Sequence, residues 1–156
     1  MKIPDHLRPP LLEQLEDQEN SEDCLTMRGS ALGHALLENN EKRDFFIEKF
    51  IKSEEPSLEG NELARELQAR GVGNILLGEN ADKYLSRAKE LFENELEKAL
   101  PDLPEDVAID VATEPLKIAR QSRSGLMENA FLIKEWSLCV SEACLLYTSP
   151  SPRDRS

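Results

Sequence analysis

One segment of the chain, residues 81–100, sets the class of fold that the sequence can adopt. Its apolar residues recur every three or four positions, so a helix gathers them into one broad stripe and turns a charged side to solvent. Asp82 in the first turn and Lys98 in the last suit the helix dipole, and Pro101 ends the helix. The stripe consists of Tyr84, Leu85, Ala88, Leu91, Phe92, Leu96 and Ala99.

The first third of the chain adds an acidic arm and two more helices. Residues 1–23 form an acid-rich arm in which Pro10 can begin a short helix. Apolar spacing over 24–52 predicts two helices, and the polar run between them places the cap of the second near Asn40 or Asp44. The first of the two carries apolar residues at Leu25, Leu32, Ala35 and Leu36.

Asparagine and glycine residues predict the bounds of the next helix. Asn61 can cap it, and Gly71 and Gly73 are expected to stop it before a turn at Asn74. Together with the helices on either side, this segment predicts a mainly α fold that resembles a helical bundle over residues 24–143.

Residues 105–113 carry a pattern that favours a strand. Val107, Ile109 and Val111 are β-branched and alternate with other residues, which is typical of a strand. The same residues could form a helix, in which Val107 and Val111 lie one turn apart. We favour a short strand around 107–113.

Two helices are expected beyond this segment. Thr113 can cap the first, which runs to about Gln121, and the polar run 120–125 separates it from a second helix over 126–141. The second helix is apolar on most sides, so we expect it to pack against partners on more than one face. Its candidate packing or partner residues are Phe131, Trp136 and Leu138.

The last residues of the chain differ in kind from the rest. Residues 144–156, CLLYTSPSPRDRS, resemble the translation of a transposon-type sequencing adapter and are expected to be a non-native tail. We therefore expect the natural sequence to continue past Ala143. On this interpretation, residues 24–143 are an incomplete domain near the N-terminal end of a longer protein.

The charge of the chain restricts its partners. Its net charge is −12, which repels the phosphates of nucleic acids and of anionic membranes over most of the surface. No uncharged apolar run reaches the roughly 18 residues that a membrane span needs, and the start has no apolar secretion signal. Cys24 and Cys139 indicate neither a disulfide framework nor a zinc site. We expect a cytoplasmic protein that binds neither nucleic acid nor membrane.

One group of cations is a candidate binding site. Lys117, Arg120 and Arg123 are spaced three apart, so on a helix they would lie roughly along one side. With Ser124 they could hold a phosphate or an acidic segment of a partner. A solvated helix face is the plainer interpretation of the same residues.

Metal and catalytic sites find no support in the sequence. His34 and Glu38 stand one helical turn apart, but two ligands do not make a metal site, so we expect a hydrogen bond between them instead. No nucleophile is placed beside a histidine in a pattern typical of catalysis. The sequence therefore indicates no metal and no cofactor.

These features favour a regulatory or protein-interaction module at the N-terminus of a larger protein. Its partner would be another protein or the missing C-terminal domain of the same chain. The alternative is a fragment of an α/β enzyme, in which 105–113 is a strand and Lys117, Arg120 and Arg123 bind a phosphate-bearing ligand. A helical nucleic-acid binder that uses the same three cations is disfavoured by the net charge.

Overall fold

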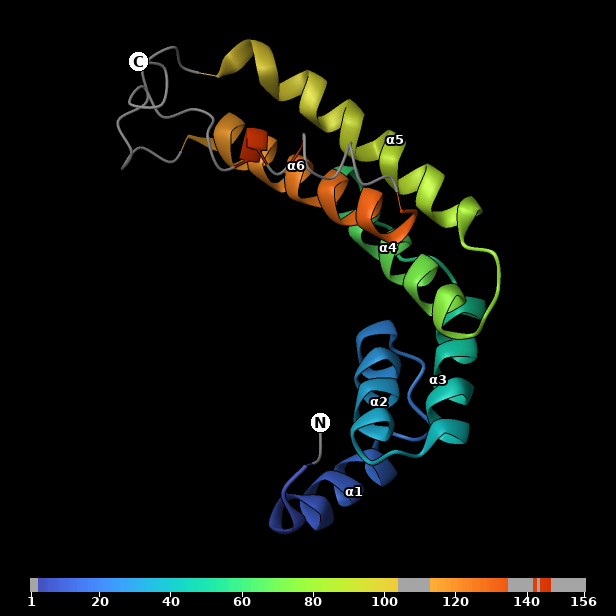
Figure 1. Cartoon of the computed structure of the whole chain (residues 1–156). Coiled ribbons are helices and arrows are strands. Elements are labelled where there is room, and N and C mark those ends of the chain that lie inside the picture. Colours follow the sequence, from blue (N-terminus) through green and yellow to red (C-terminus); the bar gives the residue numbers. More distant parts are fainter. Residues whose placement is uncertain (1–2, 104–112, 135–141, 143, 147–156) are drawn as a thin grey trace. The chain divides into compact units, whose positions relative to one another are not determined.

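Helices make up the described part of the chain, and they fall into two compact units (Figure 1). The computed structural model describes residues 3–103, 113–134, 142 and 144–146. Unit 1 comprises Met1–Glu55 and Gly73–Glu79, and unit 2 comprises Pro56–Val72 and Asn80–Ser156. No strand occurs among the described residues, so the mainly α class is confirmed. The strand predicted around 107–113 lies outside them except for its last residue.

Unit 1 begins with a 3-10 turn and continues with three helices. These are η1 (Asp5–Leu7), α1 (Arg8–Asp17), α2 (Cys24–Leu36) and α3 (Asn40–Lys52). Pro10 lies in the first turn of α1, as the sequence predicts, because a helix start does not need the amide that proline lacks. The cap of α3 is Asn39, whose Oδ1 accepts the amide N–H of Lys42 at 3.2 Å. The two helices predicted over 24–52 are thus confirmed. The cap of the second lies one residue before Asn40, the nearer of the two predicted positions.

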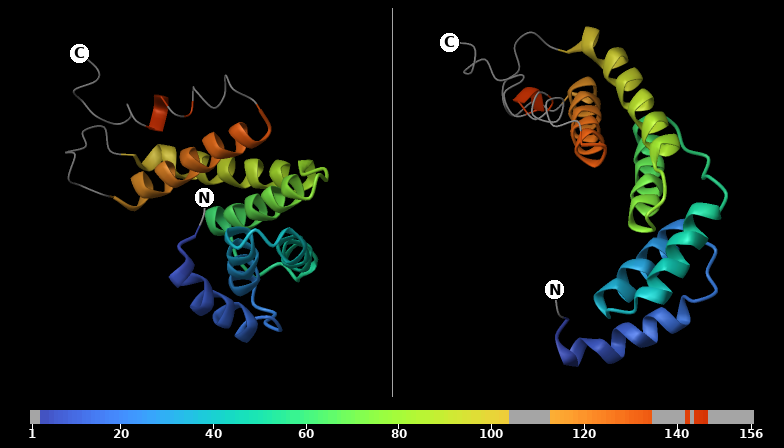
Figure 2. Two further views of the ribbon diagram at one scale, coloured as in Figure 1. Left: turned by 60° about the horizontal axis from the view of Figure 1, so that its bottom comes forward. Right: turned by 45° about the vertical axis from the view of Figure 1, so that its right-hand side comes forward.

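Helices α2 and α3 lie side by side and run antiparallel (Figures 1 and 2). The rings of His34 and Phe46 stack with a centroid separation of 5.4 Å, and Arg28 lies over the ring of Phe50. Helix α1 joins this pair through Leu15, whose Cδ2 stands 2.7 Å from the position that a Cβ on Gly33 would take. The buried apolar residues of unit 1 are Leu15, Met27, Phe46, Ile47 and Phe50.

Unit 2 is built from three longer helices. They are α4 (Gly60–Leu76), whose residues from Gly73 onward belong to unit 1, α5 (Asp82–Ala99), which continues into η2 (Leu100–Asp102), and α6 (Glu114–Leu132). Helix α5 confirms the stripe predicted over 81–100, and Asn80 accepts the amide N–H of Asp82 at its start. Thr113 caps α6, as the sequence predicts, by accepting the amide N–H of Leu116.

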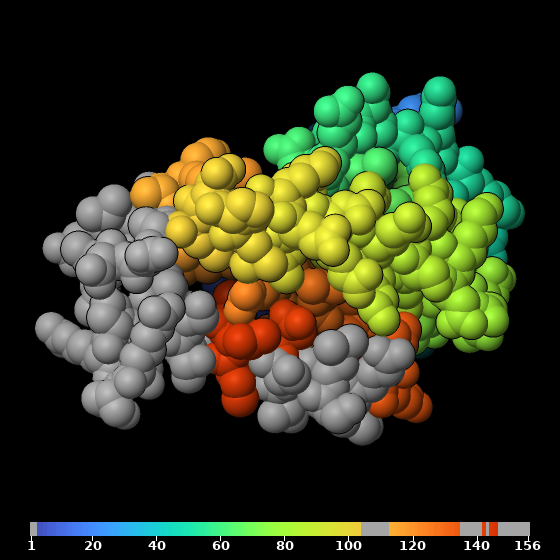
Figure 3. Space-filling view, turned by 90° about the horizontal axis from the view of Figure 1, so that it is seen from above, coloured from blue at the N-terminus to red at the C-terminus, as the bar shows by residue number. Residues whose placement is uncertain are grey.

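The helices of unit 2 alternate in direction. Gly71 lies against Leu85 and Gly60 against Glu95, so α4 and α5 are antiparallel. The side-chain amide of Asn129 in α6 donates to the Leu85 carbonyl, and the same helix returns alongside α5. Figure 3 looks onto α5, with parts of α6 beside it. The core between the helices consists of Ala64, Leu67, Ala88, Phe92 and Leu126.

Two glycines expected to stop α4 lie inside it instead. At Gly71 the Leu85 side chain approaches within 2.7 Å of where a Cβ would stand, and at Gly73 the Ile51 side chain approaches within 2.9 Å. Both glycines therefore let a neighbouring side chain approach the helix. The left-handed residue after α4 is Gly78, with φ +74°, which is the conformation that favours glycine at a helix end.

The break predicted over 120–125 is also wrong, because α6 is continuous from Glu114 to Leu132. Gly125 is buried in the middle of this helix, where the ring of Phe92 occupies the place of a Cβ. The start of the second predicted helix, up to Leu132, is thus the last part of α6. Residues 135–141, the rest of that predicted helix, lie outside the described part of the chain.

Candidate functional site

The most unusual surface in the described chain is the solvent side of α2, which is apolar. We call Leu25, Arg28, Gly29 and Leu32 the outer face of α2. Leu25 is 72% exposed and Leu32 is 63% exposed, and apart from the backbone of α2 and the two adjacent residues, no atom of the described residues lies within 4 Å of where a Cβ on Gly29 would stand. Residues spaced by four and then three positions share one side of a helix, so the two leucines flank Gly29.

The N-terminal cap sets where α2 begins and therefore which way its faces turn. Asp23 accepts the amide N–H and the hydroxyl of Thr26, each at 2.9 Å. The backbone hydrogen bond from Thr26, followed by its side-chain bond, lowers the pKa of Asp23, so this exposed cap stays charged. A charged cap at a helix N-terminus also suits the helix dipole.

The buried side of α2 is unusually polar. Ser30 is fully buried and His34 is 4% exposed, and neither Ser30 Oγ nor His34 Nδ1 has a hydrogen-bond partner among the described residues. The hydrogen bond predicted between His34 and Glu38 is not formed, because Glu38 lies past the end of α2 with φ +58°. Burial lowers the pKa of His34, with a further contribution from Lys42. The histidine is thus an interior aromatic residue stacked on Phe46 rather than a metal ligand.

Sequence reasoning identified the helix but not which side of it is exposed. Leu25 and Leu32 belong to the apolar spacing that predicts the helix, yet they face solvent while Ser30, Gly33 and His34 face the neighbouring helices. Apolar periodicity normally marks the buried side of a helix. Its inversion in α2 depends on tertiary contacts, such as Leu15 against Gly33, that no local pattern contains.

The segment that precedes α2 in the chain is rich in acidic residues. The sequence has no lysine or arginine between Arg8 and Arg28, and all six acidic residues in this segment are exposed. Glu19 forms an ion pair of 3.2 Å with Lys42, and Asp23 serves as the cap. We call the other four the acidic border: Glu13, Glu16, Asp17 and Glu22.

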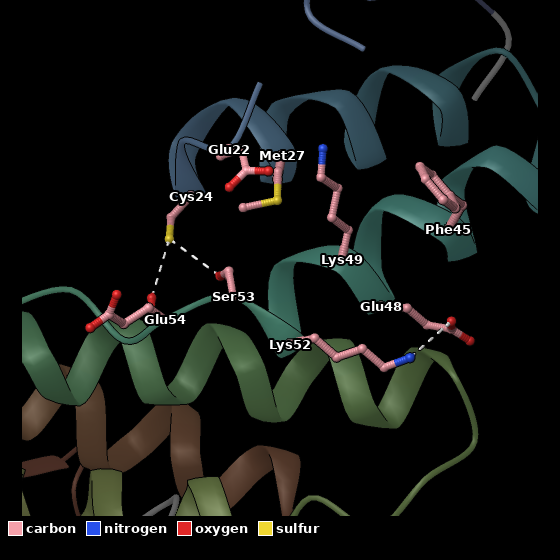
Figure 4. Close-up of a pocket in the computed structure, with 9 residues that line it drawn as sticks. All are labelled: Glu22, Cys24, Met27, Phe45, Glu48, Lys49, Lys52, Ser53 and Glu54. Atoms are coloured by element: carbon pink, nitrogen blue, oxygen red, sulfur yellow. Dashed lines mark hydrogen bonds and ion pairs between the residues drawn. The ribbon is translucent and has the colours of Figure 1, made fainter. Parts of the chain in front are cut away.

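A pocket of about 540 Å³ opens between the start of α2 and the helix α3 (Figure 4). In it the Cys24 thiol lies 3.5 Å from Ser53 Oγ and 4.0 Å from the Glu54 carbonyl oxygen, and Lys49 donates to the Ser21 carbonyl at 3.0 Å. Its lining residues are Glu22, Cys24, Met27, Phe45, Glu48, Lys49, Lys52, Ser53 and Glu54.

The chemistry of this pocket does not resemble a catalytic site. A reactive cysteine needs a cation or a base that stabilises the thiolate. The hydrogen-bond partners of Cys24 among the described residues are instead a neutral hydroxyl and a carbonyl, and Glu22 lines the same pocket. Lys52 Nζ is 3.8 Å from Glu48 Oε2, so Glu48 compensates part of the Lys52 charge. The described contacts of Cys24 thus include no cation or base that would activate the thiol, although Lys49 and Lys52 line the same pocket.

The three cations of the predicted binding site differ in their exposure to solvent. Lys117 and Arg120 are exposed on α6, and Lys117 lies 4.0 Å from Glu114. Arg123 is half-buried, and its Nη1 is buried without a hydrogen-bond partner among the described residues. Burial raises the pKa of Glu142, and the positive charge of Arg123 partly opposes this increase. Glu142 therefore lies near Arg123. A phosphate site at these residues stays a prediction.

Ser124, the fourth member of that predicted site, takes part in packing between helices. It accepts a hydrogen bond of 3.3 Å from Nη2 of Arg65, and Arg65 also pairs with Glu128. The same guanidinium lies 5.6 Å from the centre of the Phe92 ring. The described contacts of Ser124 thus join α6 to α4.

The predicted apolar partner residues are described only in part. Phe131 is 58% exposed near the end of α6, whereas Trp136 and Leu138 lie outside the described residues. Their role as a packing or partner face stays a prediction.

Comparison with known proteins gives no relative from which a function could be transferred. No family model, no curated protein and no solved structure matches the chain. Within the described residues, no helix is long and apolar enough to span a membrane. The same residues contain no group of three or more His, Cys, Asp or Glu side chains that could hold a metal ion.

Proposed function

We propose that this chain is a protein-interaction module, the N-terminal regulatory or interaction part of a larger cytoplasmic protein. The observation that supports the proposal is the outer face of α2, where Leu25 and Leu32 are largely exposed beside Gly29. Exposed leucines cost solubility and contribute little to the stability of a lone domain. A binding role gives this surface a use that the folded chain alone does not.

The distribution of exposed apolar residues supports the same role. Among the described residues, seven of the ten large exposed apolar side chains belong to unit 1. Unit 1 thus concentrates the surface that a partner could cover. The seven are Leu7, Leu12, Leu25, Leu32, Phe45, Ile75 and Leu76.

A neutral helical peptide with one leucine face and one glutamine face tests the proposal without help from charge. We expect it to bind the chain in fluorescence anisotropy, and we expect the double variant Leu25→Ser/Leu32→Ser to weaken binding by at least about tenfold, because hot-spot contacts carry most of the binding energy. Leu100→Ser is the matched control, since Leu100 is also exposed but lies in unit 2. Binding that is absent, or that the double variant leaves intact, would overturn the proposal.

A further inference from the structure

We propose that, given the interaction role above, the outer face of α2 binds a basic amphipathic helix of a partner protein. Three observations carry this inference: the shape of the face around Gly29, the acids beside it, and the charge of the chain as a whole.

The shape of the face suits a helix. Leu25 and Leu32 are separated by two helical turns, about 10 Å along the axis, and Gly29 lies between them on the same side. Because no atom approaches the Cβ position of Gly29, the surface is open there between two protruding leucines. A large apolar side chain of a docked helix fits over such a glycine, and its neighbours one turn away then contact the leucines.

The contact between α1 and α2 brings an acidic helix next to one end of this face. Gly33 follows Leu32 in the chain and stands one turn after Gly29, and Leu15 of α1 packs directly on it. Helix α1 therefore lies next to the Leu32 end of the outer face, and both views in Figure 2 show it beside α2. The exposed Glu13, Glu16 and Asp17 of the acidic border lie on this helix, with Glu13 and Asp17 on the side away from Leu15, and their charge would attract a partner with lysine or arginine on its flanks.

The one cation of the outer face, Arg28, lies on the side of this face away from α1. The guanidinium of Arg28 lies 5.6 Å from the centre of the Phe50 ring, on the side of α2 that packs on α3. A helix that approaches Gly29 from solvent thus meets two leucines, with Arg28 toward α3 and the acidic helix α1 next to the Leu32 end. This pattern selects cationic helices over anionic ones by charge and not by apolar area.

A second copy of the chain is a poorer occupant for the same reason. Two copies paired through α2 would bring two acidic borders together, and each chain carries a net charge of −12. Like charges across an interface disfavour association. A basic helix removes that repulsion and still covers the leucines.

Three synthetic helical peptides test the inference with the full chain. Each has about 18 residues, long enough to form a helix on binding, and each has the same leucine face. Their polar faces carry lysine, glutamine or glutamate. We expect the lysine peptide to bind most tightly and the glutamate peptide least tightly, and we expect added salt to narrow the difference because it screens exposed charges.

Charge variants of the chain separate the acidic border from the overall charge. Glu13→Gln/Glu16→Gln/Asp17→Asn should weaken binding of the lysine peptide by about tenfold, since each exposed pair contributes a fraction of a kcal/mol to about one, and should leave the glutamine peptide unaffected. The matched control removes the same charge from exposed positions of α5 in unit 2 and should have a much smaller effect. It is Glu90→Gln/Glu93→Gln/Glu97→Gln.

The outcomes distinguish the partner class from the interaction role itself. If all three peptides bind equally and lose binding in Leu25→Ser/Leu32→Ser, the interaction role holds and the preference for a basic helix is wrong. If the lysine peptide alone binds, without dependence on either leucine or on the acidic border, both proposals fail. Light scattering that finds a dimer abolished by the leucine double variant would identify a second copy as the occupant and overturn the inference.

Discussion

Helices α2 and α6 bury the same small motif with different results. In α2 the buried side carries Ser30 and Gly33, and in α6 it carries Ser122 and Gly125, again three residues apart. A small residue in each helix admits a neighbouring side chain, Leu15 in α2 and Phe92 in α6. The motif therefore marks close approach in both units.

The two helices differ in the hydrogen-bond partners of the motif serine. Ser122 Oγ lies 3.1 Å from Asn61 Oδ1 and 2.9 Å from the Ile118 carbonyl oxygen, so it has acceptors on both helices. Ser30 Oγ has no partner among the described residues. Opposite the motif, α6 presents charged residues such as Lys117 and Arg120, whereas α2 presents leucines. Around the motif, α6 follows the usual division of polar and apolar sides, although Phe131 is exposed near its end and Arg123 Nη1 is buried without a partner among the described residues, whereas α2 departs from it at the motif itself.

That departure teaches where a function is expected. Sequences usually satisfy local rules together, and sites that break them often serve a role outside folding. Helix α2 breaks two rules at once, with leucines in solvent and unpaired polar atoms inside. The predictions below test whether its interior is as tightly packed as that of α6.

The largest effect is expected from the aromatic residue that packs against His34. Phe46→Ala should lower the free energy of unfolding by about 3–5 kcal/mol, the usual cost of removing a buried phenylalanine side chain, because Phe46 is almost fully buried. Phe45→Ala is the matched control. The Phe45 side chain is 56% exposed, so its removal should lower the free energy of unfolding by well under half as much. Denaturant unfolding followed by circular dichroism measures both. Equal losses would mean that unit 1 has no tightly packed interior.

Alanine at two glycines should change stability in opposite directions. Gly125→Ala should cost about 1–3 kcal/mol because the new methyl group meets the ring of Phe92. Gly29→Ala should stabilise α2 by about 0.4–1 kcal/mol, since alanine is the better helix former and nothing opposes its side chain. The same unfolding experiment compares them. A destabilising Gly29→Ala would show that the outer face is already covered.

Two serines test directly whether polar partners distinguish the helices. Ser122→Ala should cost about 1–2 kcal/mol because Asn61 loses a buried partner. Ser30→Ala should be neutral or slightly stabilising, since it removes a buried hydroxyl that has no partner among the described residues. A loss at Ser30 as large as that at Ser122 would indicate that a buried water satisfies Ser30, and the contrast between the helices would disappear.

Long, regular patterns were predictable from the sequence. The helix predicted over 81–100 is found as Asp82–Ala99, because its stripe is broad and its ends carry their own signals in Asn80 and Pro101. Thr113 was identified as a cap because its role depends on the residues that directly follow it. Such features need only local information.

Tertiary contacts decided the features that the sequence could not give. A glycine in a helical pattern either ends the helix or admits a neighbour, and Gly71, Gly73 and Gly125 were assigned to breaks although Leu85, Ile51 and Phe92 pack on them. The candidate cations lie in different environments for a geometric reason. Residues three apart advance by about 300° around a helix, so Lys117 and Arg123 diverge by about 120°, enough to leave one exposed and the other half-buried.

The smallest effect is expected from protonation of His34, and it probes the buried side of α2. Because the pKa of His34 in the folded chain lies below its ordinary value of 6.5, the unfolded chain takes up the proton first as pH falls. The stability that the neutral ring contributes is therefore complete above about pH 6.5 and decreases as pH falls from there toward the lower pKa of the folded state. Burial causes most of this shift, Lys42 adds to it, and Glu19 opposes it.

A comparison of variants isolates this titration from the many carboxylates that titrate at lower pH. His34→Leu should flatten the decrease in the free energy of unfolding just below pH 6.5, whereas His6→Gln should leave it unchanged because His6 is exposed in η1. Unfolding curves measured from pH 5 to pH 8 span the window in which histidine charges. If the wild-type chain and His34→Leu follow the same pH profile, the ring is already hydrated in the folded state. The polar interior of α2 would then be a solvated surface, and its contrast with α6 would reduce to the exposed leucines alone.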